Sequence, residues 1–112
     1  MHELAITCNI VELVSEAAKG RKVTRVTVEI GKLSGVMPDA IAFCFPEVAR
    51  GTEAESAMLD IREIDAAARC DICGLEFPTP SMLTICPCGS LRFQRVVGEE
   101  LNVKSIELDE VV

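Results

Sequence analysis

The sequence predicts an α+β fold in which a small three-stranded sheet with two helices is interrupted by a zinc-ribbon-like module. Three observations support this: apolar residues at helical spacing, three alternating segments rich in β-branched residues, and an aperiodic stretch rich in cysteine and proline. A length of 112 residues suits one domain that carries a small inserted module. We therefore expect a discontinuous α+β domain over residues 1–66 plus 98–112, and a zinc-binding module over residues 67–97.

The beginning of the chain predicts a helix followed by a strand. Residues 3–19 carry apolar side chains at helical spacing, and Gly20 follows as a natural stop. Residues 23–30 are rich in β-branched side chains that alternate with polar ones, so they predict a strand with one buried face. Cys8, like Cys44 further along, lies inside a helical pattern, and we interpret both as small buried hydrophobes.

A second helix and two more strands complete the predicted domain. Pro38 suits the first turn of a helix, which Pro46 should kink or end near Phe45 because proline removes a backbone donor. Residues 58–64 and 100–108 alternate as strands do. The last strand should pair with the two earlier ones beneath the two helices.

The composition argues against several classes of function. A net charge of −7 repels a phosphate backbone, and a chain with four Phe but no Trp or Tyr lacks stacking platforms for bases. No apolar run approaches the roughly 20 residues that cross a bilayer, and the start lacks the basic and apolar segments of a secretory signal. A single histidine leaves no general-base arrangement for a hydrolytic enzyme. We expect a cytoplasmic protein that is not an enzyme and binds neither nucleic acid nor a membrane.

Four of the six cysteines form two short pairs, Cys70 with Cys73 and Cys86 with Cys88, on either side of residues 74–85. This spacing is close to that of a zinc ribbon, in which four thiolates surround Zn(II) as a tetrahedron. Such a site has no open position, so the zinc would be structural and not catalytic. The second pair is one residue shorter than a usual ribbon turn, and we expect a perturbed site that forms through a different local turn.

Two other interpretations of the cysteines stay open. The first pair has the Cys-x-x-Cys spacing of a redox-active dithiol, but such a dithiol normally begins a helix in a βαβ unit, which the proline-rich surroundings do not provide. The cysteines can also be unrelated thiols. Against this, a module of about 30 residues is too small to be stable without a cross-link such as a bound metal.

The first three residues, Met1-His2-Glu3, gather several metal-binding donors. The terminal amine, two main-chain amides and the imidazole offer four nitrogens in one plane, which suits Ni(II) or Cu(II) and not tetrahedral zinc. The first amides of a helix have no intrahelical acceptor, so a metal can take them without breaking the helix. Taken alone, however, a histidine at the second position is usually an exposed side chain with no metal role.

Four segments, in this order and at these distances, resemble the HypA family of nickel metallochaperones. They are the start MHELAI, the stretch VTVEIGKLSGVMPDAIAF, the Cys-x-x-Cys-Gly module and the closing GEELNVKSIEL. The resemblance implies a small cytoplasmic accessory protein that helps to insert nickel into [NiFe]-hydrogenases and, in some organisms, urease. It also implies two partners, a HypB-type GTPase and the hydrogenase large subunit.

The resemblance assigns roles to particular residues. It implies that His2 is the principal Ni(II) ligand and that Met1 and Glu3 contribute through main-chain nitrogen or side chain. The family commonly has Cys-Pro-x-Cys-Gly at the second cysteine pair, so this chain is one residue short there. The implied ligands of a structural Zn(II) are Cys70, Cys73, Cys86 and Cys88.

The leading hypothesis is therefore a carrier that binds transferable Ni(II) at its N-terminus and holds structural Zn(II) in its module. The alternative is a zinc-ribbon adaptor that recognises a protein partner and carries no transferable metal. A third possibility, a thiol oxidoreductase, would need a reactive cysteine of low pKa in the active protein without metal. The residues do not decide between a monomer and a homodimer.

Overall fold

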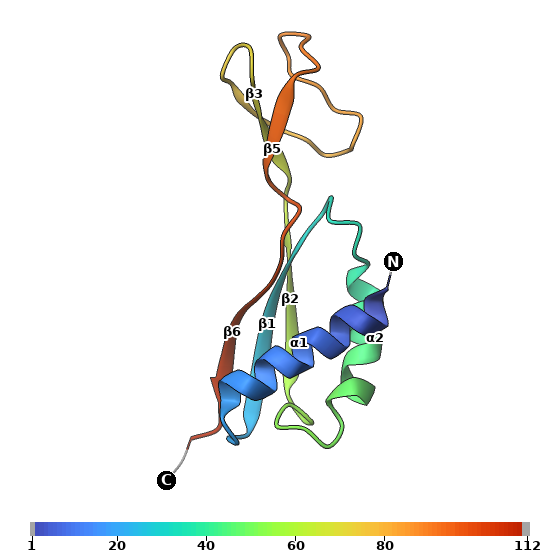
Figure 1. Cartoon of the computed structure of the whole chain (residues 1–112), viewed down its shortest axis with the longest axis vertical. Helices are drawn as coiled ribbons and strands as arrows, with labels where there is room; N and C mark the ends of the chain where they lie inside the picture. The colour runs from blue at the N-terminus through green and yellow to red at the C-terminus, as the bar shows by residue number, and fades with distance from the viewer. Residues whose placement is uncertain (1, 111–112) are drawn as a thin grey trace. The chain divides into compact units, whose positions relative to one another are not determined.

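The computed structural model describes residues 2–110 and shows two helices and two three-stranded sheets in that range (Figure 1). In chain order the elements are α1 (Glu3–Ala18), β1 (Val23–Gly31), α2 (Pro38–Ala49), β2 (Met58–Ile64), β3 (Ala67–Cys70), β4 (Glu76–Pro78), β5 (Phe93–Val97) and β6 (Leu101–Leu108). The strand order is β2-β1-β6 in the first sheet and β4-β3-β5 in the second. The predicted α+β fold with an interrupting cysteine module is confirmed.

Within the described range the chain divides into two compact units. The first comprises residues up to Glu29, Met37–Arg62 and residues from Asn102 onward, and the second comprises Ile30–Val36 and Glu63–Leu101. The second unit contains all four clustered cysteines. The expected domain boundaries, 1–66 plus 98–112 against 67–97, stay a prediction.

The first unit is built around apolar side chains from both helices and the central strand β1. The helices bury residues three or four positions apart, as the helical period requires. Full burial of each larger aliphatic side chain contributes about 1.5–3 kcal/mol. The buried set is Ile10, Val11, Val14 and Ala18 of α1, Val23, Val26 and Val28 of β1, and Ile41, Phe45 and Ala49 of α2. Neither helix of the described chain is long and apolar enough to cross a membrane.

Helix α2 continues past a proline that we expected to kink or end it. The helix includes Pro46 and reaches Ala49, so an end near Phe45 is wrong, and the kink stays a prediction. Proline removes the hydrogen bond that would reach the carbonyl four residues earlier, which belongs to Ala42. Both Ala42 and Pro46 are exposed, so water can hydrogen-bond to that carbonyl in place of the missing N–H.

The two cysteines outside the cluster are less buried than the sequence suggested. Cys8 is exposed and Cys44 is half-buried, so the expectation of two buried thiols is wrong. The neighbouring Thr7 takes the buried position instead, with none of its surface exposed. Its hydroxyl donates to the carbonyl of Glu3 at 2.7 Å, which satisfies the polar group inside the core.

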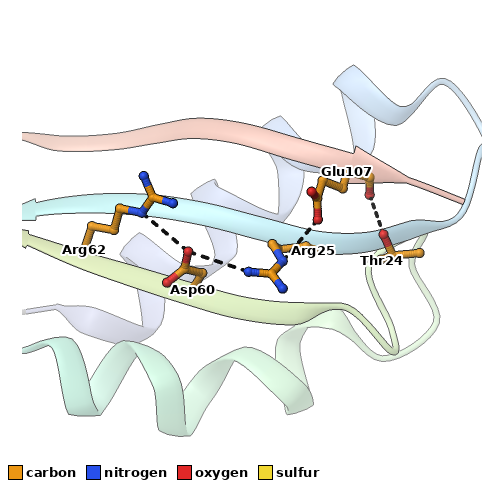
Figure 2. A network of polar contacts seen from close by, with 5 residues as sticks. All are labelled: Thr24, Arg25, Asp60, Arg62 and Glu107. Atoms are coloured by element: carbon orange, nitrogen blue, oxygen red, sulfur yellow. Dashed lines mark hydrogen bonds and ion pairs between the residues drawn. The ribbon is translucent and has the colours of Figure 1, made fainter.

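Charged side chains link the three strands of the first sheet across one face, as Figure 2 shows. Arg25 on the central strand β1 pairs with Asp60 of β2 at 3.9 Å and with Glu107 of β6 at 3.1 Å. Asp60 also accepts an ion pair from Arg62 at 3.5 Å. These groups are partly exposed, so each pair contributes at most about 1 kcal/mol. Their main effect is to favour this pairing of neighbouring strands over others.

Two glycines in the second unit let three backbone segments approach closely. A Cβ on Gly31 would overlap the carbonyl oxygen of Gly98, and a Cβ on Gly98 would overlap the backbone of Ala66. Hydrogen bonds hold this crossing together: the N–H of Gly31 donates to Glu100 at 2.8 Å, and the N–H of Leu33 donates to Gly98 at 2.9 Å. Side chains larger than hydrogen are therefore excluded at both glycines.

Substitution of Gly31 by alanine should destabilise the protein by about 3 kcal/mol, because the overlapping atoms are backbone and cannot rotate away. Gly20→Ala is the matched control. Gly20 has φ of 82° but open space around its Cβ position, so only backbone strain of about 1–2 kcal/mol applies there. The comparison requires urea unfolding of both variants under identical metal loading. Equal losses in the two variants would show that the crossing tolerates a side chain.

Candidate metal centres

A small apolar cluster positions two of the four cysteines of the second unit. Cys70 ends strand β3 and lies opposite Phe93 of β5. Cys70 and Cys86 are buried with Ala68 and Phe77, and Phe93 packs against this group. The rings of Phe77 and Phe93 meet edge to face with centroids 5.6 Å apart. The sulfurs of Cys70 and Cys86 therefore approach from a fixed apolar base, whereas Cys73 and Cys88 are exposed.

A tight turn follows the first cysteine of each pair. The N–H of Gly74 donates to the carbonyl of Cys70 at 3.1 Å, and the N–H of Gly89 donates to the carbonyl of Cys86 at 2.8 Å. Both glycines adopt positive φ, 75° and 91°. The short pair, with Cys88 two residues after Cys86, thus lies in a reverse turn.

The four sulfur atoms converge on one point. All four lie within 4.8 Å of one another. The sulfurs of Cys73 and Cys86 are 3.5 Å apart, and those of Cys70 and Cys88 are 3.7 Å apart. Tetrahedral zinc with sulfur ligands at about 2.3 Å places those sulfurs about 3.8 Å apart. The donor set and its spacing therefore fit one zinc ion.

Two thiols of this cluster, Cys70 and Cys86, have pKa values shifted in opposite directions. The backbone N–H of Cys73, 3.4 Å from the Cys70 sulfur, lowers the pKa of the Cys70 thiol to about 6, with help from the N–H of Ile72. Burial raises the pKa of the Cys86 thiol to about 12. At neutral pH the metal-free cluster therefore has a thiolate at Cys70 and a proton on Cys86. A metal cation must displace that proton, so its binding weakens as pH falls.

The predicted nickel ligands belong to the first unit, at the start of α1. His2 is exposed and occupies the N-cap position, where its side chain makes no capping hydrogen bond. Its carbonyl accepts the first helical hydrogen bond, from the N–H of Ile6 at 3.0 Å. The imidazole is therefore not engaged in capping the helix. Met1 lies outside the described residues.

Glu3 connects the starts of the two helices. Its carboxylate accepts a hydrogen bond from the backbone N–H of Met37 at 3.2 Å, and this contact lowers the pKa of Glu3. Met37 is the N-cap of α2, and Asp39 lies in the first turn of that helix. Met37 was not predicted from the sequence, because its role depends on a backbone N–H and not on its side chain. No spacing between positions 3 and 37 signals the contact.

The chain matches known proteins along its whole length. Residues 1–108 match the family described as hydrogenase/urease nickel incorporation, metallochaperone, hypA. The hydrogenase maturation factor HypA of a Nostoc species is 52% identical over 111 residues, which cover 99% of this chain and 98% of that protein. The corresponding factor of Geobacter metallireducens is 46% identical over 110 residues, with 97% of this chain and 100% of that protein covered.

A solved structure has the same fold. The solution structure of the Ni metallochaperone HypA from Helicobacter pylori covers 96% of this chain and 97% of its own, with a TM-score of 0.72 and 25% identity. The family's description is that of a metal carrier, which agrees with the expectation that this chain is not an enzyme. From its match over residues 1–108 and its relatives at about half identity, the chain belongs to the HypA family of nickel metallochaperones in hydrogenase maturation.

Proposed function

We propose that this chain binds Ni(II) at Met1-His2-Glu3 and delivers it during maturation of a [NiFe]-hydrogenase, with urease as a second recipient. One observation carries the proposal: the family match runs unbroken through residues 1–108 and so includes both the terminal tripeptide and the four cysteines. Family membership supplies the metal and the process. The chemistry of the residues at the start of α1 supports the position of the nickel within the chain.

The start of α1 offers the donors that nickel prefers. The exposed His2 imidazole is free, and the first main-chain amides of a helix have no intrahelical acceptor. Together with the terminal amine they supply a plane of nitrogens, which suits Ni(II) better than the tetrahedral arrangement of a zinc site. The exposed position of His2 also leaves the bound ion within reach of a recipient protein.

The four clustered cysteines serve a different purpose in this proposal. Four sulfurs within 4.8 Å of one another suit a structural zinc ion. When bound, zinc supplies a permanent cross-link between the two turns and leaves no coordination position open to a substrate. The chain's own residues contribute the apolar base beneath Cys70 and Cys86 and the N–H groups that favour the Cys70 thiolate.

The partners and the compartment follow from the same reasoning. Nickel insertion requires a recipient, and we propose the hydrogenase large subunit together with a HypB-type GTPase. These proteins act in the cytoplasm, where a reducing environment keeps the cysteines available for metal. The chain works either as a monomer or as a homodimer.

Ni(II) titrated calorimetrically into tag-free, zinc-loaded protein should bind at about one ion per chain, because one tripeptide supplies one set of planar donors. A version with one extra N-terminal residue should lose this binding, and so should His2→Ala, while both keep their zinc. Elemental analysis of all three proteins provides the control. Equal nickel binding in the native and extended proteins would favour the zinc-ribbon adaptor that carries no transferable metal.

Replacement of Cys70 by serine should abolish stoichiometric zinc and unfold the second unit, since an apolar cluster of four buried residues cannot hold two turns together alone. Cys8→Ser is the matched control, because Cys8 is exposed and lies outside the cluster. The measurements are zinc per chain by elemental analysis and the dispersion of amide signals for residues 63–101. If Cys70→Ser retained one zinc per chain, the four-cysteine site would be wrong.

The apparent zinc affinity should fall by at least about tenfold for each unit of decreasing pH, since at least the Cys86 proton is displaced on binding. The decline should steepen by about a further tenfold per unit below pH 6, where the metal-free Cys70 thiolate also becomes protonated. Competition against a chelator whose own pH dependence is known measures both slopes. An affinity independent of pH between 6 and 8 would contradict sulfur ligation.

A further inference from the structure

A groove runs along helix α1 where this helix packs against α2 (Figure 1). The groove has a volume of about 570 Å³ and is open to solvent. Its α1 wall comes from three successive turns, with Cys8, Glu12 and Glu16 four residues apart. The opposite wall consists of Val48 of α2 and of Thr52, which follows that helix. At a rise of 1.5 Å per residue, the α1 wall is about 12 Å long.

The base of the groove is apolar. Val11 is buried and Val48 is half-buried, and both side chains line the groove. The hydroxyl of Thr52 is already engaged within the chain, because it donates to the carbonyl of Ala49 at 2.7 Å and accepts the N–H of Ala54 at 3.1 Å. The groups that remain available for polar recognition are therefore mainly the two glutamates.

Two carboxylates without basic partners give the groove its charge. Glu12 and Glu16 are exposed and lie about one helical turn apart. Like charges at this spacing destabilise a helix slightly, so the stability of α1 does not explain the pair. None of the ion pairs among residues 2–110 involves either glutamate. No lysine or arginine lines the groove. Its two negative charges therefore attract a cationic group.

This charge argues against several kinds of occupant. The carboxylates repel the phosphate groups of nucleic acid and of an anionic membrane surface. A second copy docked about a two-fold axis would bring the same patch against itself, with four carboxylates facing one another. A basic segment of a different protein meets neither obstacle. The aliphatic parts of its lysine or arginine side chains suit Val11 and Val48, while the charged ends stay at Glu12 and Glu16.

The spacing of the two carboxylates specifies the spacing of the basic residues. Glu12 and Glu16 are about 6 Å apart along the axis of α1. In an extended segment, residues two positions apart point to the same side and lie about 6.7 Å apart. Neighbouring residues point to opposite sides, so only one of them would reach the groove. An extended segment of about four residues also matches the length of the α1 wall.

We propose that this groove binds an extended segment of a partner protein in which two basic residues are separated by one other residue. Their ammonium or guanidinium groups pair with Glu12 and Glu16, and their aliphatic parts cover Val11 and Val48. The groove contains neither the proposed nickel ligands nor any cysteine of the cluster. This proposal and the proposed function can therefore fail separately.

The test is an NMR titration of full-length, zinc-loaded protein at constant ionic strength with two peptides of identical composition. Ac-Ala-Lys-Ala-Lys-Ala-amide has the proposed spacing, whereas Ac-Ala-Lys-Lys-Ala-Ala-amide has adjacent lysines. We expect saturable shifts of the Glu12, Glu16 and Thr52 amides with the first peptide. The second peptide should bind about three- to fivefold more weakly, because one exposed ion pair is lost.

Five variants separate the charge of the groove from its shape. Glu12→Gln and Glu16→Gln should each weaken binding of the first peptide about three- to fivefold. Glu99→Gln, which changes an exposed glutamate of the second unit, should bind as the native protein does. Asn9→Trp should fill the groove from an exposed lining position and abolish binding, although both carboxylates remain. Leu13→Trp is its control, because Leu13 is exposed on α1 outside the lining.

Four results would overturn the proposal. Shifts that stay linear up to about 20 mM of the first peptide would show that no site exists. Equal affinity for the two peptides, or equal affinity in Glu12→Gln and the native protein, would show unspecific attraction. Tighter binding of 1,4-diaminobutane, which carries the same two charges, would assign the groove to a free diamine. A dimer in sedimentation velocity that Asn9→Trp abolishes would assign the groove to a second copy of the chain.

Discussion

The convergence of four sulfur atoms is the constraint on which the second unit depends. Its buried side chains are few, and the loops that contain Cys73 and Cys88 are largely exposed. A chain segment this short cannot repay its conformational entropy by apolar burial alone. The two glycine turns, the edge-to-face phenylalanines and the register of β3 with β5 all serve to bring the sulfurs within 4.8 Å of one another. In the proposed function, a bound zinc ion supplies the stability that the apolar burial of this unit does not provide.

The two proposed metal sites rest on opposite physical principles. The cysteine site is half-buried, its donors come from two turns, and its ligands must lose protons, so the ion would be held permanently. In the terminal site His2 is exposed, and all the donors come from one short segment. Fewer supporting contacts mean less stored binding energy, which suits an ion that has to leave. The first unit, by contrast, is stabilised by its apolar core.

Local sequence patterns were sufficient to predict most of the fold. The helix and strand periods and the cysteine spacing predicted both helices, the strands of the first sheet and the set of clustered sulfurs. The failures depend on surroundings that the pattern does not contain. Pro46 is tolerated because its helix face meets water. Thr7 is buried in place of its neighbour Cys8, because the Thr7 hydroxyl is satisfied by the Glu3 carbonyl.

The contact between Glu3 and Met37 was missed for a similar reason. It joins two residues that only the tertiary fold brings together, through a backbone N–H. A single sequence contains no periodic trace of such contacts. The sequence therefore predicts only candidate site residues with distinctive metal-binding chemistry, such as the cysteines and His2. It does not predict residues such as Met37, which act through the backbone.

The hydrogen bond between Glu3 and Met37 also limits how nickel can bind at the proposed site. Coordination through the main-chain nitrogen of Glu3 leaves its carboxylate on the Met37 N–H, so the starts of α1 and α2 stay joined. Coordination through Oε2 would withdraw the acceptor from the Met37 N–H, whereas coordination through the other oxygen, Oε1, would leave it in place. The same contact lowers the pKa of Glu3, so the bond persists until the pH falls well below neutrality. Nickel bound at the proposed site through the main-chain nitrogen or Oε1 of Glu3 would therefore keep the two helix starts joined, and only coordination through Oε2 would separate them.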